Sequence, residues 1–158
     1  YAKGKDILKT FYESHEGDWT VPASLEGWFS IRVGKYHLHG RIDRIDKMPD
    51  GTLEIIDYKT GKVKEKLVGE DKDQLLIYQI ATEQLPEYQV MGIPSKLTFY
   101  YLEGNAPVTF LGTEIEKEKL LNKIITTIDK IYSGDFSATP GEFTCKFCDF
   151  KDICQHRI

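Results

Sequence analysis

Residues 40–59 read GRIDRIDKMPDGTLEIIDYK, and this stretch decides the fold. Isoleucines are interspersed with charged residues in its first half and gather again in its second, which suits strands with a buried face. Pro49, Asp50 and Gly51 stand in succession between the two halves, which favours a tight turn. The stretch therefore predicts two antiparallel strands, over residues 36–46 and 52–59.

The flanking segments extend this pair into a sheet with helices around it. Aromatic and β-branched residues predict further strands, and apolar residues at helical spacing predict helices. The expected strands are 27–33, 95–103 and 107–112, and the expected helices are 1–15, 71–85 and 114–134. This order of elements predicts an α/β (α+β) fold in which helices flank a mixed central sheet.

Length and composition limit the class of protein. The chain has 158 residues, which suits one domain with a sizeable core, and its net charge is −4. That charge argues against binding nucleic acid through a broad basic surface, although acidic residues that hold metal ions contribute to it. No apolar run approaches the roughly 20 residues needed to cross a bilayer, so we expect no membrane partner.

Asp43, Asp57 and Lys59 carry the chemistry that the central stretch predicts. Residues two apart on a strand share a face, about 7 Å apart, so Asp57 and Lys59 point the same way. The turn brings Asp43 alongside. Carboxylates suit Mg²⁺ or Mn²⁺, and a nearby lysine can orient water or stabilise charge on a phosphate. We predict a metal site of Asp43, Asp57 and the carbonyl of Tyr58, with Lys59 as a catalytic residue.

The alternative for these residues is a solvated strand face with one ion pair, because exposed pairs are common and contribute little. Ile55 and Ile56 directly before Asp57 favour an interior strand, where a charge is costly unless it is paired or bound to metal. His37 and His39, which share a strand face, are more simply interpreted as packed or solvated side chains than as metal ligands.

Three successive segments resemble motifs of the RecB-type branch of the PD-(D/E)XK nuclease superfamily. They are GRIDRID at residues 40–46, IIDYKTG at residues 55–61 and QLLIY at residues 74–78. Each is modest alone, but their order and spacing are specific together, and the resemblance runs from about Glu26 to the C-terminus. It implies a restriction-endonuclease-like fold over residues 1–140, with Asp43 and Asp57 as metal ligands and Lys59 as the catalytic lysine.

The resemblance also concerns the helix that begins near residue 71. Gln74 and Tyr78 are one turn apart on it and share a face. The family places these two residues against the active site, where they contact substrate or catalytic groups. By helix pattern alone, Tyr78 packing in the core and Gln74 lying in solvent fits equally well.

One element of the family pattern has no clear match. The family supplies a further metal ligand, often a histidine, from an N-terminal helix, and Glu13 and His15 match it only weakly. Glu26, ahead of the predicted first strand, resembles a recurrent glutamate of the family that can be structural. We expect the chain to be a fragment of a longer protein, with this ligand upstream of Tyr1.

Cys145, Cys148 and Cys154 form a C-x2-C-x5-C pattern in the tail, residues 141–158. Three clustered thiols among apolar residues suit a soft-metal or cluster site, and they indicate a cytoplasmic protein rather than a secreted, disulfide-bonded one. The resemblance implies a [4Fe–4S] cluster completed by a cysteine from far upstream. A zinc site with His156 as fourth ligand, or three free thiols, are the alternatives.

We therefore expect a Mg²⁺- or Mn²⁺-dependent deoxyribonuclease. By resemblance, its substrates are DNA ends, single-stranded or duplex, its mode is exonucleolytic, and a helicase domain or subunit in DNA repair or recombination is its partner. Two other interpretations stay open. One is a non-catalytic DNA-binding scaffold with a structural iron–sulfur or zinc site, and the other is a different metal-dependent phosphoesterase that acts on RNA.

Overall fold

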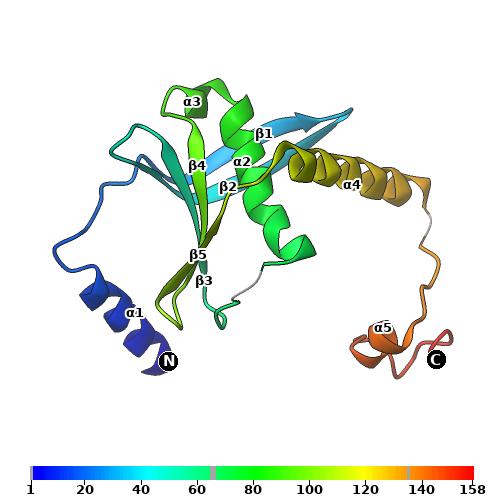
Figure 1. Ribbon diagram of the computed structural model, residues 1–158. Coiled ribbons are helices and arrows are strands. Elements are labelled where there is room, and N and C mark those ends of the chain that lie inside the picture. The colour runs from blue at the N-terminus through cyan, green and yellow to red at the C-terminus, as the bar shows by residue number, and fades with distance from the viewer. Residues whose placement is uncertain (1, 65–66, 135) are drawn as a thin grey trace. The chain divides into compact units, whose positions relative to one another are not determined.

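The computed structural model describes residues 2–64, 67–134 and 136–158, and it divides into two compact units, residues 1–125 and 126–158. The first unit contains the sheet (Figure 1). Its five strands are β1 (Ser24–Val33), β2 (Tyr36–Lys47), β3 (Leu53–Lys59), β4 (Pro94–Tyr101) and β5 (Ala106–Phe110). The predicted boundary between a domain and a tail at residue 141 stays a prediction.

The strands are ordered β1-β2-β3-β4-β5 in one mixed sheet. The first three form an antiparallel meander, β4 runs parallel to β3, and β5 is antiparallel to β4. A parallel pair needs a crossover connection, and the helix α2 (Asp73–Gln84) lies in the segment that supplies it. The predicted fold class, a mixed sheet flanked by helices, is confirmed.

Tight turns at two glycines make the meander possible. Gly34 joins β1 to β2 with a φ of 60°, and Gly51 lies in the turn before β3 with a φ of 84°. Both values fall in the left-handed region, which glycine enters without a steric penalty. The meander is longer than the sequence pattern suggests, because β1 begins at Ser24 rather than at residue 27. Glu26 therefore lies inside the first strand, and its expected place ahead of that strand is wrong.

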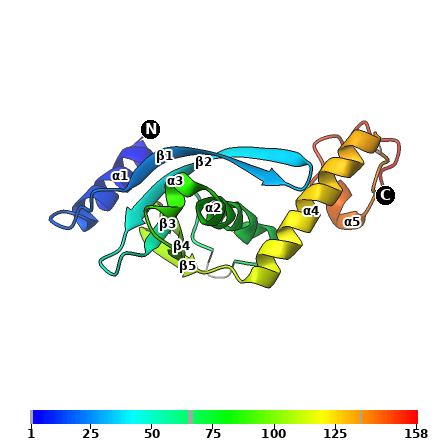
Figure 2. The ribbon, with the colours of Figure 1, turned by 90° about the horizontal axis from the view of Figure 1, so that it is seen from above.

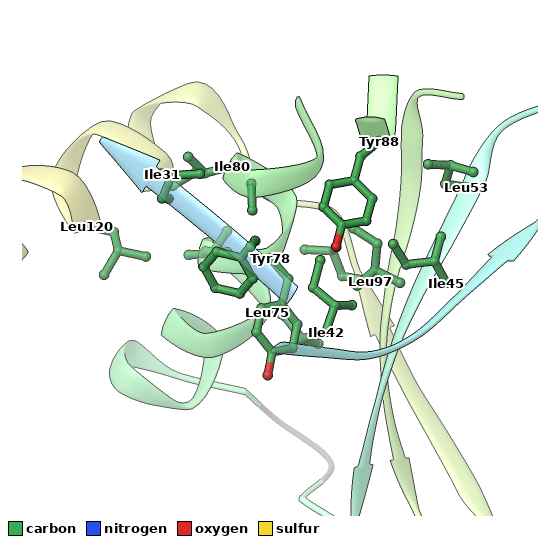
Figure 3. Close-up of a cluster of buried hydrophobic side chains, with 14 of the residues drawn as sticks. Ile31, Ile42, Ile45, Leu53, Leu75, Tyr78, Ile80, Tyr88, Leu97 and Leu120 are labelled. Carbon is green, nitrogen blue, oxygen red and sulfur yellow. The ribbon is translucent and has the colours of Figure 1, made fainter. Parts of the chain in front are cut away.

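Helix α2 packs against one face of the sheet, and seven of its twelve residues are buried. Leu75, Ile80 and Ala81 are at most 3% exposed. Figure 3 shows this core, to which each of the first four strands and the helices α2, α3 (Pro86–Gln89) and α4 (Glu114–Ser133) contribute side chains. Because the buried residues of α2 occupy successive positions rather than one narrow stripe, its pattern is that of a core helix rather than of a surface helix.

Helix α1 (Ala2–Ser14) packs against the other face. The ring of Phe11 lies 5.9 Å from that of Tyr58 and 5.3 Å from that of Tyr100, centroid to centroid, in edge-to-face geometry. Tyr58 alternates with Asp57 and Lys59 along β3, so the two faces of this strand meet different helices. Side chains on α2's side of β3 are therefore separated by the sheet from those on α1's side.

The remaining elements are short. A 3-10 turn, η1 (Gly69–Lys72), leads into α2, and the second unit contains the five-residue helix α5 (Glu142–Lys146). Within the described residues, no helix combines the length and the apolar character that crossing a membrane requires.

Candidate active site

Strand pairing brings the two predicted metal-binding carboxylates together. The β2–β3 ladder ends at the pair Arg44 and Ile56, so the next step of the same register sets Asp43 opposite Asp57. At this step the Asp43 side chain accepts a hydrogen bond at Oδ2 from the backbone N–H of Tyr58, over 3.1 Å. The two strands thus stop pairing through their backbones where the carboxylates begin.

Asp57 is the most unusual residue of the site. It is 1% exposed, and its Oδ2 has no hydrogen bond of acceptable geometry, although Lys59 Nζ lies 2.6 Å away as an ion-pair partner. Burial raises the pKa of Asp57, the Lys59 ammonium opposes this shift, and the negative charge of Asp43 adds to it. A buried carboxylate oxygen with spare coordinating capacity raises the free energy of the folded protein unless a group binds it. A cation site requires oxygens of this kind.

A chain of hydrogen bonds fixes Lys59 from the helix side. Lys59 Nζ donates to Gln74 Oε1 over 2.6 Å, and Gln74 Nε2 donates to the Tyr78 hydroxyl over 3.0 Å. The ammonium also lies 5.0 Å from the centroid of the Phe99 ring, within cation–π range. The structure therefore brings Gln74 and Tyr78 beside Asp57 and Lys59, as the resemblance implied.

Tyr78 is buried in the core but its hydroxyl reaches the site. Its pKa is raised first by burial, an effect that the Gln74 hydrogen bond reduces, and then by the negative charges of Asp57, Asp43 and Glu26. The phenol therefore stays protonated over the physiological range and can donate a hydrogen bond. Tyr78 thus packs in the core and also accepts the hydrogen bond that ends the polar chain, and its role in the proposed site stays a prediction.

Glu26 stands where the register of β1 and β2 would place it opposite Asp43, but these two residues do not pair. Its φ of 49° lies in the left-handed region, which a residue with a Cβ enters only at a steric cost. Strain of this kind persists where the surrounding structure holds it, and it gathers at functional sites. The sequence pattern gave no sign of this backbone conformation.

The donor set fits a hard divalent cation. Asp43 and Asp57 supply oxygen ligands, and Mg²⁺ commonly keeps several waters and takes only one or two carboxylates from a protein. Within the described ranges, no group of three or more His, Cys, Asp or Glu side chains is gathered closely enough to hold a metal ion. The Tyr58 carbonyl stays a predicted ligand, while its side chain turns to the other face, where Arg44 Nη1 lies 3.3 Å from its hydroxyl.

The weaker candidates lie elsewhere. His15 packs among aromatic rings on the α1 side of the sheet, and its Nδ1 is 2.8 Å from the carbonyl oxygen of Phe11. Glu13 is exposed and pairs with Lys9 over 3.7 Å. His37 and His39 stack on each other on an exposed face of β2. None of these four residues joins Asp43 and Asp57 in the described part of the chain.

The three cysteines belong to the second unit. All are half-buried free thiols, and hydrogen bonding to the backbone of Ile158 and Gly141 lowers the pKa of Cys145. In the described residues they do not gather with each other or with His156 into a group of metal ligands. The arrangement therefore does not fit a [4Fe–4S] cluster or a zinc ion as it stands, and both stay predictions.

Sequence reasoning missed a second polar network on the α1 face. Arg44 Nε donates to Asp46 Oδ1 over 2.7 Å, and Thr20 Oγ1 donates to Asp46 Oδ2 over 2.9 Å. The repeat in RIDRID conceals this network, since Asp43 and Asp46 are both preceded by arginine and isoleucine. Asp43 and Asp46 point to opposite faces of the sheet, and this difference was the signal that sequence reasoning missed.

The fold and this site define a class of protein. The chain matches the PD-(D/E)XK nuclease superfamily over residues 4–155, and it belongs to that superfamily. Its relatives include one subunit of the ATP-dependent helicase/deoxyribonuclease of Clostridium perfringens strain SM101, with 33% identity over 124 residues, and the same subunit from strain 13, with 32%. The match covers 67% of this chain and 10% of these relatives, so the chain spans about a tenth of their length.

A comparison of structures agrees on the fold. The crystal structure of SSO0001 matches 98% of this chain and 70% of its own, with a TM-score of 0.53 and 22% identity. The resemblance to RecB-type PD-(D/E)XK nucleases that the motifs indicated is confirmed.

Proposed function

We propose that this chain is a Mg²⁺- or Mn²⁺-dependent deoxyribonuclease whose active site consists of Asp43, Asp57 and Lys59. The observation that carries the proposal is the buried Asp57 Oδ2, which lacks a hydrogen bond although it lies beside a second carboxylate and an ammonium group. When bound, the metal ion would activate water and neutralise the phosphodiester.

The residues of the chain have separate tasks in this proposal. Asp43 and Asp57 hold the ion, with the Tyr58 carbonyl as a further predicted ligand. Lys59 holds the attacking water in place or stabilises the negative charge that develops on the phosphate. Gln74 and Tyr78 act on Lys59 through their hydrogen-bonded chain, which limits where the ammonium can lie. Gln74 and Tyr78 are in this respect positioning residues.

The names of the relatives support the choice of substrate and partner. These relatives are named for a helicase and a deoxyribonuclease together, and this chain matches about a tenth of their length. We propose that it acts on DNA ends as an exonuclease in DNA repair or recombination, in the cytoplasm, and next to a helicase domain or subunit. A non-catalytic DNA-binding scaffold is the alternative, and the buried Asp57 carboxylate beside a second carboxylate argues against it, because a scaffold gains nothing from the cost of burying like charges together.

The test is cleavage of end-labelled linear single-stranded DNA with Mn²⁺, with Mg²⁺ and with EDTA. Lys59→Ala is compared with Lys47→Ala, a matched change at an exposed lysine of β2. We expect metal-dependent cleavage that only Lys59→Ala loses. Equal cleavage by both variants would refute the site. Cleavage of RNA but not of DNA of the same sequence would show the phosphoesterase alternative, and circular DNA separates exonuclease from endonuclease action.

The cysteine tail needs its own measurement. Analysis of iron, sulfide and zinc in protein purified without oxygen distinguishes a [4Fe–4S] cluster from zinc and from free thiols. The proposed reaction assigns no chemical step to the three thiols.

A further inference from the structure

Beyond the carboxylates, β1 and β2 continue as a long two-stranded ribbon (Figure 2). The inner face of the ribbon buries Phe29, Ile31 and Val33, so the alternate residues of β1 point outward. Three cross-strand pairs make up the outer face, and we call them the Trp–His strip: Trp28 with Arg41, Ser30 with His39, and Arg32 with His37.

The aromatic rings of the strip are stacked on one another but open to solvent. Trp28 and His39 lie 5.8 Å apart between centroids with planes 19° apart, and His39 and His37 lie 6.4 Å apart with planes 15° apart. Trp28 is 59% exposed, although burying an indole side chain is much more favourable in free energy than leaving it in solvent. A row of nearly parallel, exposed rings is a platform on which further flat rings can stack.

The charge of the ribbon is opposite to that of the whole chain. Residues 28–41 contain Arg32, Lys35 and Arg41 and no Asp or Glu, whereas the chain carries a net charge of −4. Arg41 adjoins Trp28, and Arg32 adjoins His37. Cationic side chains interleaved with stacking rings match a ligand with regularly spaced anions and flat faces, which is the chemistry of a nucleic acid strand.

The backbone beneath the strip is fixed from the core. The Tyr88 hydroxyl donates a hydrogen bond to the carbonyl oxygen of Trp28 over 2.9 Å. Gly27 permits this approach, since a Cβ at that position would lie 2.7 Å from the same hydroxyl oxygen. A platform that is already ordered loses less conformational entropy when a ligand binds.

We propose that the Trp–His strip binds single-stranded DNA by base stacking. The inference rests on the proposed function, since it takes DNA as the substrate. Stacking selects a single strand over a duplex because only unpaired bases expose their faces. The arginines contact phosphates, and the rings contact bases.

The test is the equilibrium binding of a fluorescein-labelled oligothymidine in EDTA, where cleavage does not interfere. Trp28→Ala is expected to weaken binding on the order of ten-fold, from the usual value of base–aromatic stacking. Tyr12→Ala, at an aromatic residue that is 56% exposed on α1, is the matched control and should leave binding unchanged. Arg41→Gln should reduce the slope of log K against log salt by about 0.7, and Lys47→Gln should not.

A second measurement follows Trp28 itself. The chain has two tryptophans, so Trp19→Phe leaves Trp28 as the sole indole. Its fluorescence should be quenched by oligothymidine and not by an abasic oligomer of equal length, which carries the phosphates without the bases. Equal quenching by both oligomers, or wild-type affinity in Trp28→Ala, would overturn the proposal. Failure of the wild-type chain to bind would also overturn it and would favour a protein partner on the strip.

The two proposals fail in different ways. Binding to the strip without metal-dependent cleavage would leave the strip in place and refute the nuclease. Cleavage with a Trp28→Ala variant that binds and cuts like the wild type would refute the strip and leave the nuclease.

Discussion

Two aspartate–cation pairs lie at the junction of β2 and β3, on opposite faces of the sheet, and they differ in how completely they are hydrogen-bonded. Asp46 accepts hydrogen bonds from Arg44 at both carboxylate oxygens, and from Thr20 as well. Asp57 meets Lys59 only as an ion pair and keeps one buried oxygen without a hydrogen bond. Both aspartates are buried.

The comparison shows that burial alone does not make a carboxylate reactive. A buried charge whose hydrogen bonds are all made has a structural role, because removing any partner leaves its desolvation free energy uncompensated. A buried charge with an unfilled lone pair keeps part of that cost in the folded protein, and a cation relieves it. On this basis we assign Asp46 a structural role and propose a role in the reaction for Asp57.

The largest expected effect is on cleavage. Asp57→Asn should reduce metal-dependent DNA cleavage on the order of 10³-fold or more, because it removes a charged metal ligand. Asp46→Asn should change cleavage only a few-fold under conditions in which the variant is folded. Rates are measured on labelled single-stranded DNA, with circular dichroism as the control for folding. Equal losses in both variants would remove the distinction between the pairs.

The next largest effect is on the free energy of unfolding, where the Arg44–Asp46 pair should matter more than the Lys59–Asp57 pair. Arg44→Met should lower the free energy of unfolding by about 3 kcal/mol, since it leaves Asp46 buried without its main partner. Lys59→Met should cost less than about 1 kcal/mol, because burial already raises the pKa of Asp57 and this carboxylate can take up a proton when the ammonium is removed. Urea unfolding in EDTA measures both. The double change Arg44→Met with Asp46→Leu should recover much of the loss, and failure to recover it would contradict the pairing.

A third carboxylate extends the comparison to the surface. Glu116 and Thr113 form a capping box at the start of α4, and hydrogen bonds from the Thr113 backbone, from Lys72 and from the Thr113 hydroxyl lower the pKa of Glu116 to about 2. A lowered pKa stabilises the fold above the unfolded value of 4.5, and this contribution is lost as the pH falls toward 2.

After discounting for solvent screening, we expect Glu116 to contribute about 1 kcal/mol at neutral pH. Glu116→Gln should therefore be less stable than the wild type at pH 7, and the difference should vanish as the pH approaches 2. The midpoints of urea unfolding of both proteins, measured between pH 7 and pH 2, test this expectation. A difference that grows as the pH falls would have the wrong sign for a lowered pKa.

The smallest effect distinguishes a functional residue from a structural one most directly. In EDTA, Asp57→Asn should be as stable as the wild type or more stable by up to about 1 kcal/mol, because burial disfavours the charged carboxylate and raises its pKa. Added Mg²⁺ or Mn²⁺ should raise the melting temperature of the wild type and not that of the variant. A metal-induced shift of equal size in both proteins would show that Asp57 does not bind the ion.

Much of the fold follows from local patterns in the sequence. The meander, the helix after it and the last two strands are all encoded by alternation, helical spacing and turn residues, which act between close neighbours in the chain. The junction of GRIDRID with IIDYK also determines that Asp43 and Asp57 are neighbours, since one short turn and a fixed register leave no other arrangement. Identity of the family follows from the same segments.

Tertiary structure alone decided how each charge is used. Asp43 and Asp46 are both preceded by arginine and isoleucine, yet Asp46 faces Arg44 and Thr20 while Asp43 faces Asp57. The backbone of Glu26 and the stacked rings of the Trp–His strip likewise depend on residues that are far apart in the chain or on the other strand. Hydrogen bonds and desolvation are set by three-dimensional surroundings, and a linear pattern holds no record of which lone pair is left unfilled.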